Sequence, residues 1–98
     1  MVLEAPLGEA MNKAVAELQQ QSMQQIQHAT AITWAGRALA SYVLFERTGD
    51  LQRLLDGEEF GHEAVEHASL AGVPGFSDLI AAHVHDAREH ALATWDPR

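Results

Sequence analysis

The feature that most constrains the fold of this chain is the segment from Gly8 to Arg47, which contains no proline and is dominated by alanine, leucine, glutamine, methionine and glutamate. These residue types have high helix propensity, and proline is the residue that most strongly interrupts a helix. The segment therefore predicts one helix of about 40 residues, which would extend about 60 Å if unbroken. We expect the preceding residues 1–7 to form a flexible N-terminal tail.

Two further helices are predicted, and each is preceded by a turn that contains glycine. Gly49 is suited to end the first helix, and Asp50 is suited to cap the start of the second. The sequence at residues 72–75, Gly-Val-Pro-Gly, predicts the second turn. The expected fold class is all-α, a long N-terminal helix with a folded-back helical hairpin in a single domain over residues 8–98. The three predicted helices span about residues 8–47, 50–71 and 76–95.

The side of the first helix that faces the hairpin is predicted from apolar positions at steps of three and four. Gly57 and Gly61 each cost about 1 kcal/mol relative to alanine inside a helix, which a close approach of two backbones would offset. Folding the second helix back sets Gly57 beside Ala40 and Gly61 beside Gly36. The predicted inward stripe comprises Met11, Val15, Leu18, Ser22, Ile26, Ala29, Thr33, Gly36, Ala40 and Val43.

The predicted first helix is too long for its neighbours to cover. The second helix reaches only from about residue 27 onward, so the N-terminal half lacks a full intrachain partner. A chain of 98 residues is also small and buries only roughly 60% of its unfolded surface as a monomer. We therefore expect a homodimer or larger homo-oligomer that completes a helical bundle. The predicted interaction residues are Val15, Leu18, Met23 and Ile26.

Composition limits the partners that this chain would attract. The formal net charge is -8, which disfavours nucleic acid and anionic membranes and favours a basic protein partner or a metal cation. The most apolar run, residues 38–45, is far too short to span a bilayer. The first residues also lack the basic and apolar regions of a signal peptide, so we expect a cytoplasmic protein.

A cluster of carboxylates and imidazoles is predicted where the second and third helices face each other. Glu58 and His62 are spaced i,i+4, as are Asp86 and His90, so each pair shares one helix face. Folding the hairpin about its turn sets Glu58 level with Glu89. Because the chain has no cysteine, nitrogen and oxygen would hold any divalent metal, which suits zinc, iron or manganese. The candidate metal ligands are Glu58, Glu59, His62, Asp86, Glu89 and His90.

The segment Glu59-Phe60-Gly61-His62 resembles the Glu-x-x-His ligand motif of ferritin-like di-iron bundles. The resemblance covers four residues and implies a metal-binding bundle with oxidase or storage activity. This chain has one such motif, and the residue of the first helix expected level with Glu59 is Ala38 rather than an acid. Two other interpretations of the cluster remain: a solvated acidic helix face, or a pH-sensitive patch in which carboxylates favour charged imidazoles.

No motif for acyl or phosphoryl transfer is present. The four serines lie outside any Gly-x-Ser-x-Gly context, and there is no glycine-rich phosphate loop. The sequence therefore favours a role without catalysis. Our main hypothesis is a small acidic helical protein–protein interaction or assembly module, adaptor-like or chaperone-like, that self-associates. The alternative is the divalent-metal-binding helical bundle.

Overall fold

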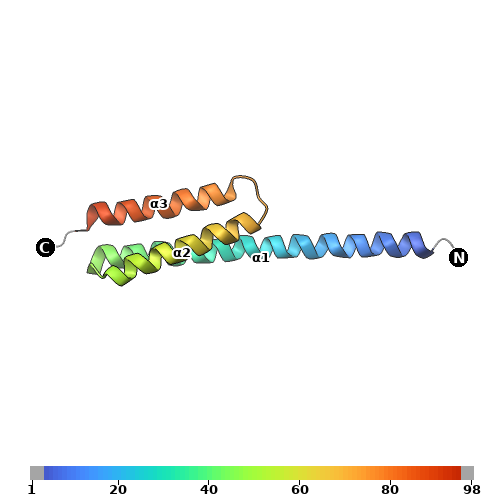
Figure 1. Ribbon diagram of the computed structural model, residues 1–98, viewed down its shortest axis with the longest axis horizontal. Coiled ribbons are helices and arrows are strands. Elements are labelled where there is room, and N and C mark those ends of the chain that lie inside the picture. Colours follow the sequence, from blue (N-terminus) through green and yellow to red (C-terminus); the bar gives the residue numbers. More distant parts are fainter. Residues whose placement is uncertain (1–3, 96–98) are drawn as a thin grey trace.

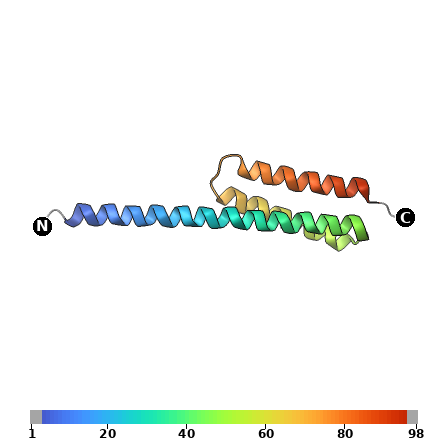
Figure 2. The same cartoon turned by 180° about the vertical axis from the view of Figure 1, so that it is seen from behind.

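The computed structural model describes residues 4–95, with side chains from residue 8 onward. Over this range the protein is all-α, with three helices and no strand: α1 (Glu4–Thr48), α2 (Leu51–Leu70) and α3 (Phe76–Thr94). α2 folds back along the C-terminal half of α1, and α3 reverses again, so that the N-terminal half of α1 projects alone (Figures 1 and 2). The protein is elongated, with extents of 81 × 20 × 12 Å. None of the described helices combines the length and hydropathy needed to cross a membrane.

The N-terminal end of α1 lies earlier than the sequence predicts. Residues 4–7 belong to the predicted tail, yet α1 begins at Glu4, and residues 1–3 lie outside the described residues. Pro6 falls within the first turn of α1, where backbone N–H groups have no intrahelical acceptor. Proline is therefore tolerated there without the loss of a helical hydrogen bond.

The C-terminal half of α1 packs against α2 and α3 through small and aromatic side chains. The buried apolar positions of α1 repeat at steps of four and three, which places them on one face of the helix. Burial of Tyr42 and Phe45 removes two aromatic side chains from water, and the alanines let the helix axes approach closely. The residues of this inner face are Ala31, Ala35, Ala38, Tyr42 and Phe45.

The face of α2 that meets α1 and α3 is built from glycine and alanine, namely Gly57, Gly61, Ala64 and Ala68. A Cβ atom at Gly57 would lie 2.5 Å from Cε1 of Tyr42, and one at Gly61 would lie 2.5 Å from Cγ1 of Val84 on α3. Both glycines are therefore required for close packing. Their neighbours are a tyrosine of α1 and a valine of α3.

These contacts correct the predicted inward stripe of α1. The predicted neighbours Ala40 and Gly36 are exposed, and a Cβ atom at Gly36 would meet nothing within 4 Å. The stripe from Met11 to Val43 therefore faces away from α2, and the inner face lies on the opposite side of the helix. The reason lies in the half of α1 that α2 covers. There the predicted stripe offers one large apolar side chain, Val43, whereas the inner face offers the larger apolar area of Tyr42 and Phe45.

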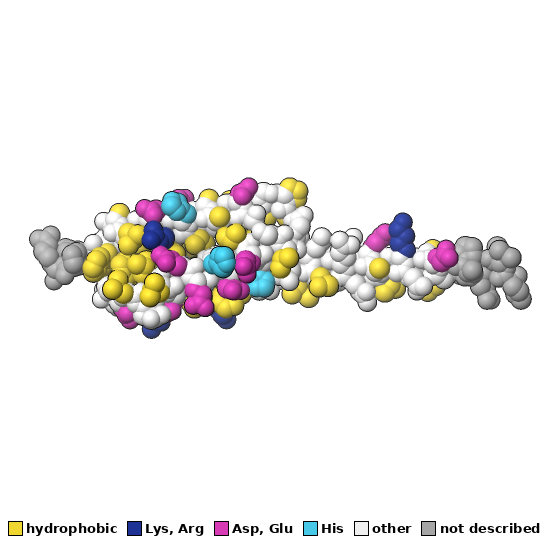
Figure 3. Space-filling model, viewed as in Figure 1, with side chains coloured by type: hydrophobic (Ala, Val, Ile, Leu, Met, Phe, Trp, Pro, Cys, Tyr) yellow, Lys and Arg dark blue, Asp and Glu magenta, His cyan; other side chains and the backbone are white. Residues whose placement is uncertain are grey.

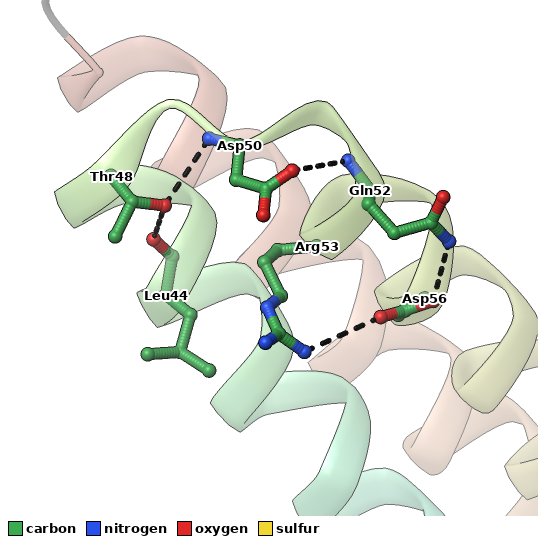
Figure 4. A network of polar contacts seen from close by, with 6 residues as sticks. All are labelled: Leu44, Thr48, Asp50, Gln52, Arg53 and Asp56. Atoms are coloured by element: carbon green, nitrogen blue, oxygen red, sulfur yellow. Dashed lines mark hydrogen bonds and ion pairs between the residues drawn. The ribbon is translucent and has the colours of Figure 1, made fainter.

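The turn between α1 and α2 is fixed by glycine and by local capping (Figure 4). Gly49 has φ +69°, a conformation that favours glycine. The hydroxyl of Thr48 donates to the carbonyl oxygen of Leu44 at 2.7 Å and accepts from the N–H of Asp50 at 3.2 Å. The carboxylate of Asp50 accepts from the N–H of Gln52 at 3.0 Å, so Asp50 caps α2 as the sequence predicts.

The glycine contacts predict how alanine substitutions change stability. Gly61→Ala is expected to lower the free energy of unfolding, because overpacking of about 1–3 kcal/mol opposes a gain in helix propensity of about 1 kcal/mol. In a Val84→Ala background the clashing methyl is absent, so Gly61→Ala should become neutral or stabilising. Urea unfolding of the four proteins of this cycle measures the coupling.

The matched control is Gly57→Ala in the same two backgrounds. Its new methyl meets the buried ring of Tyr42, and Val84 is not among the nearest neighbours of that methyl. Gly57→Ala should therefore destabilise by a similar amount with either residue at position 84. An equal loss for Gly61→Ala in both backgrounds would show that Val84 is not its neighbour.

Candidate interaction surface

A second stripe of α1 faces away from α2 and α3 along most of the helix. Its positions repeat at steps of four and three, and every one of them is exposed. Most are apolar or small, whereas a helix face that stays in water is usually polar. We call this surface the outer stripe: Met11, Val15, Leu18, Ser22, Gln25, Ala29, Ile32, Gly36, Leu39 and Val43.

Helix geometry explains why the outer stripe lacks an intrachain neighbour. Two residues nine positions apart are separated by about two and a half turns, so their side chains point in opposite directions. Ala29 and Ala38 have this separation; Ala38 is 0% exposed, whereas Ala29 is exposed. The same relation holds between Gly36 and the buried Phe45. Because the inner face packs against α2 and α3, the outer stripe on the opposite side of α1 cannot take part in that packing.

The four interaction residues predicted from the sequence are all strongly exposed. Leu18 is 62% exposed and Val15 is 51% exposed, and both belong to the outer stripe. Ile26 lies at its edge, beside Ser22 and Ala29, whereas Met23 lies about 140° around the helix from Leu18. Both are exposed to a similar extent. A shallow groove along this one helix has a volume of about 470 Å³ and is lined by Val15, Leu18, Gln19, Ser22 and Met23. Hydrophobic side chains are visible on the protruding part of α1 in Figure 3.

The outer stripe is also free of charge over its central part. No Asp, Glu, Lys or Arg occurs between Leu18 and Gly36, whereas α2 carries five acids against the one base Arg53. Acidic side chains accordingly gather over α2 and α3 in Figure 3. The negative charge of the chain is thus concentrated away from the centre of the outer stripe.

The glutamine-rich part of α1 meets the turn between α2 and α3. The His28 ring stacks on Phe76 with ring centroids 4.2 Å apart, and Gln27 hydrogen bonds to His67. An open groove of about 360 Å³ lies beside these contacts. This pairing could not be predicted from the sequence, because glutamine and histidine side chains suit both solvent and a polar contact. The groove is lined by Gln21, Gln24, Gln25, His28, Ala71, Gly72 and Val73.

Two of the predicted metal ligands contact one guanidinium group. Arg88 Nε donates to Glu58 Oε1 at 2.9 Å, and Arg88 Nη1 donates to Glu89 Oε1 at 3.1 Å. The hydrogen bond to Glu58 raises the pKa of Arg88, which stays positively charged. Glu58 and Glu89 are therefore level, as the hairpin register predicts, but the cation between them is an arginine that the sequence reasoning missed. The pairs are partly exposed, so each contributes less than about 1 kcal/mol.

The other predicted ligands are dispersed. His62 lies 3.1 Å from Glu66 one turn along α2, and His90 lies 3.9 Å from Glu46 of α1. Glu59 and Asp86 are exposed. Within the residues that the structure describes, no three His, Asp or Glu side chains form a group that could hold a metal ion. Metal binding stays a prediction from the sequence, and no contact in this region favours it.

Comparisons of this chain with protein-family models, with curated proteins and with solved structures find no match. The functional argument therefore depends on the geometry and charge of the chain itself.

The phenol of Tyr42 allows a test of the packing beside Glu58. Burial raises the pKa of Tyr42 above its ordinary value of 10.0, the charge of Glu58 raises it further, and Arg88 opposes both. The folded protein thus holds the phenol proton more tightly than the unfolded chain does. This contribution to stability is complete below pH of about 10 and is lost as pH rises through the folded-state pKa.

Tyr42 is the one tyrosine in the sequence, so the ultraviolet absorbance of its phenolate reports its titration directly. We expect a midpoint above that of the urea-unfolded protein. Stability should fall with rising alkaline pH more steeply in the wild-type protein than in Tyr42→Phe. A midpoint equal to that of the unfolded chain would contradict the burial of this ring beside Glu58.

Proposed function

We propose that this protein is a small helical interaction module, of the adaptor or assembly-subunit kind, that works as a homo-oligomer. The observation that carries the proposal is the outer stripe, an exposed and largely apolar helix face whose centre has no charge. An interface core is typically depleted of charged residues and enriched in large apolar ones. Val15, Leu18 and Ile26 are the central interaction residues of this proposal; Met23, the fourth residue predicted from the sequence, lies outside the outer stripe.

The size of the exposed surface supports association. The accessible surface is 7012 Å², and a compact monomer of this mass would expose about 5,500 Å². The difference of about 1,500 Å² is nearly twice the roughly 800 Å² that each partner buries in a standard stable interface. The radius of gyration is 20.2 Å, whereas a compact domain of this length would have about 13 Å. Association along α1 would bury surface that the isolated chain exposes.

The distribution of charge supports association through α1 rather than through the hairpin. Two acidic surfaces of α2 repel each other when they are brought together, and this cost is several kcal/mol for juxtaposed like charges. The central outer stripe carries no such charge. Self-association through α1 would also leave the acidic surface of α2 accessible to a second, basic protein, which suits an adaptor.

Charge insertion tests this proposal. Leu18→Glu and Ile26→Glu each place a carboxylate in the proposed interface of both copies, so each should raise the dissociation constant of the oligomer at least about tenfold. Sedimentation velocity over a concentration series measures the change. Circular dichroism should show retained helix in both variants, because neither side chain is buried in the monomer.

The matched control is Gln20→Glu, which adds the same charge at an exposed position. Gln20 lies nine residues from Met11, so it points away from the outer stripe. This variant should associate like the wild-type protein. A wild-type protein that stays monomeric at high concentration, or a response equal at all three positions, would refute the proposed function.

A further inference from the structure

We propose that two copies of this chain pair through their outer stripes in antiparallel orientation, about a twofold axis level with Gln27. This inference rests on the proposed function and adds the orientation, the register and the contacting residues. It arises from the order of large and small side chains along α1. When two copies of the stripe run in opposite directions, large side chains of one face small side chains of the other. This match identifies the partner as a second copy of the chain.

The antiparallel register matches side chains by size. In antiparallel helix pairs with a heptad repeat, the two seam positions of each heptad face each other across the interface. When the stripe is reversed on itself, Leu18 faces Gly36 and Ile32 faces Ser22, so a large side chain meets a small one. The five layers, each occurring twice, are Met11 with Val43, Val15 with Leu39, Leu18 with Gly36, Ser22 with Ile32 and Gln25 with Ala29.

The space at Gly36 fits this arrangement. A Cβ atom at Gly36 would meet nothing within 4 Å in the isolated chain, so the glycine has no intrachain packing role. Glycine inside a helix costs about 1 kcal/mol relative to alanine. A leucine of the partner above Gly36 would account for this glycine, as Tyr42 and Val84 account for Gly57 and Gly61.

The register is set by the ends of the outer stripe. In the proposed register all ten positions have a partner. A shift by one heptad in one direction leaves Leu39 and Val43 without a partner, and a shift in the other direction leaves Met11 and Val15 exposed. Because hydrophobic stabilisation is proportional to the apolar area removed from water, the central register buries the most apolar surface.

A parallel pairing fits less well. Like residues would then meet, so Gly36 would face Gly36 of the second copy and Leu18 would face Leu18. The glycine layer would leave a gap between the helices, whereas in the antiparallel pairing Leu18 fills the space at Gly36. The antiparallel pairing also lays each protruding N-terminal half of α1 against the C-terminal half of the second α1. Each end of the dimer then contains four helices, which completes the bundle.

Disulfide trapping tests the orientation, and the absence of native cysteine makes it specific. Val15→Cys and Leu39→Cys are prepared separately, unfolded together, refolded as a mixture and equilibrated in a glutathione buffer. Both positions are exposed in the isolated chain, so neither substitution opens a cavity in the core. Mass spectrometry without reduction should find the mixed disulfide between the two variants in at least about tenfold excess over either symmetric disulfide.

The other outcomes separate this inference from the proposed function. Symmetric disulfides in each variant alone would indicate parallel pairing and overturn the orientation while keeping self-association. A dimer in sedimentation that forms no disulfide would exclude the outer stripe as its interface. Monomers in every sample would overturn both the inference and the proposed function.

Exchanging the large and the small side chain of one layer tests the register independently. Gly36→Leu should weaken the dimer about tenfold or more, because the facing Leu18 then has no room, and adding Leu18→Ala should restore most of the affinity. Gln20→Leu, on the opposite side of α1, is the control and should leave the dissociation constant unchanged. Additive losses in the double variant would show that positions 18 and 36 do not meet.

Discussion

Close contact between α1 and α2 through small side chains is the interaction on which the rest of this structure depends. Gly61 brings α2 close to Val84 of α3, and Gly57 brings it so close to α1 that an added methyl would lie 2.5 Å from Tyr42. On α1 the same contact uses alanines together with Tyr42 and Phe45. Because side chains nine residues apart point in opposite directions, this choice of inner face leaves the outer stripe exposed.

The proposed interaction surface is thus a consequence of the packing inside one chain. A helix with two apolar faces can bury only one of them against a hairpin of two shorter helices. The other face then stays exposed, and the length of α1 beyond the hairpin adds to the exposed apolar surface. The charged side chains are distributed in the same way: most acids lie on α2 and α3, whereas the centre of the outer stripe has none.

The polar contacts of the hairpin show how one basic residue changes the interpretation of an acidic cluster. Glu58 and Glu89 lie level with each other, a geometry that suits a metal ion when the sequence is considered alone. Arg88 occupies the position between them and forms hydrogen bonds with both. The buried ring of Tyr42 packs against Gly57, and the charges of Glu58 and Arg88 act on its phenol. The Glu58–Arg88 ion pair therefore borders the core.

The sequence by itself determined the all-α class, the three helices and the capping by Asp50, because helix propensity, turn chemistry and capping act between residues close in the chain. Only the tertiary structure decided which face of α1 packs inward, that Arg88 lies between Glu58 and Glu89, and that Gln27 and His28 meet the turn before α3. Two faces of α1 have the same helical period, so periodicity cannot choose between them. The choice depends on how well whole helices fit together, and here the buried area of Tyr42 and Phe45 favoured the inner face over the stripe that contains Gly36.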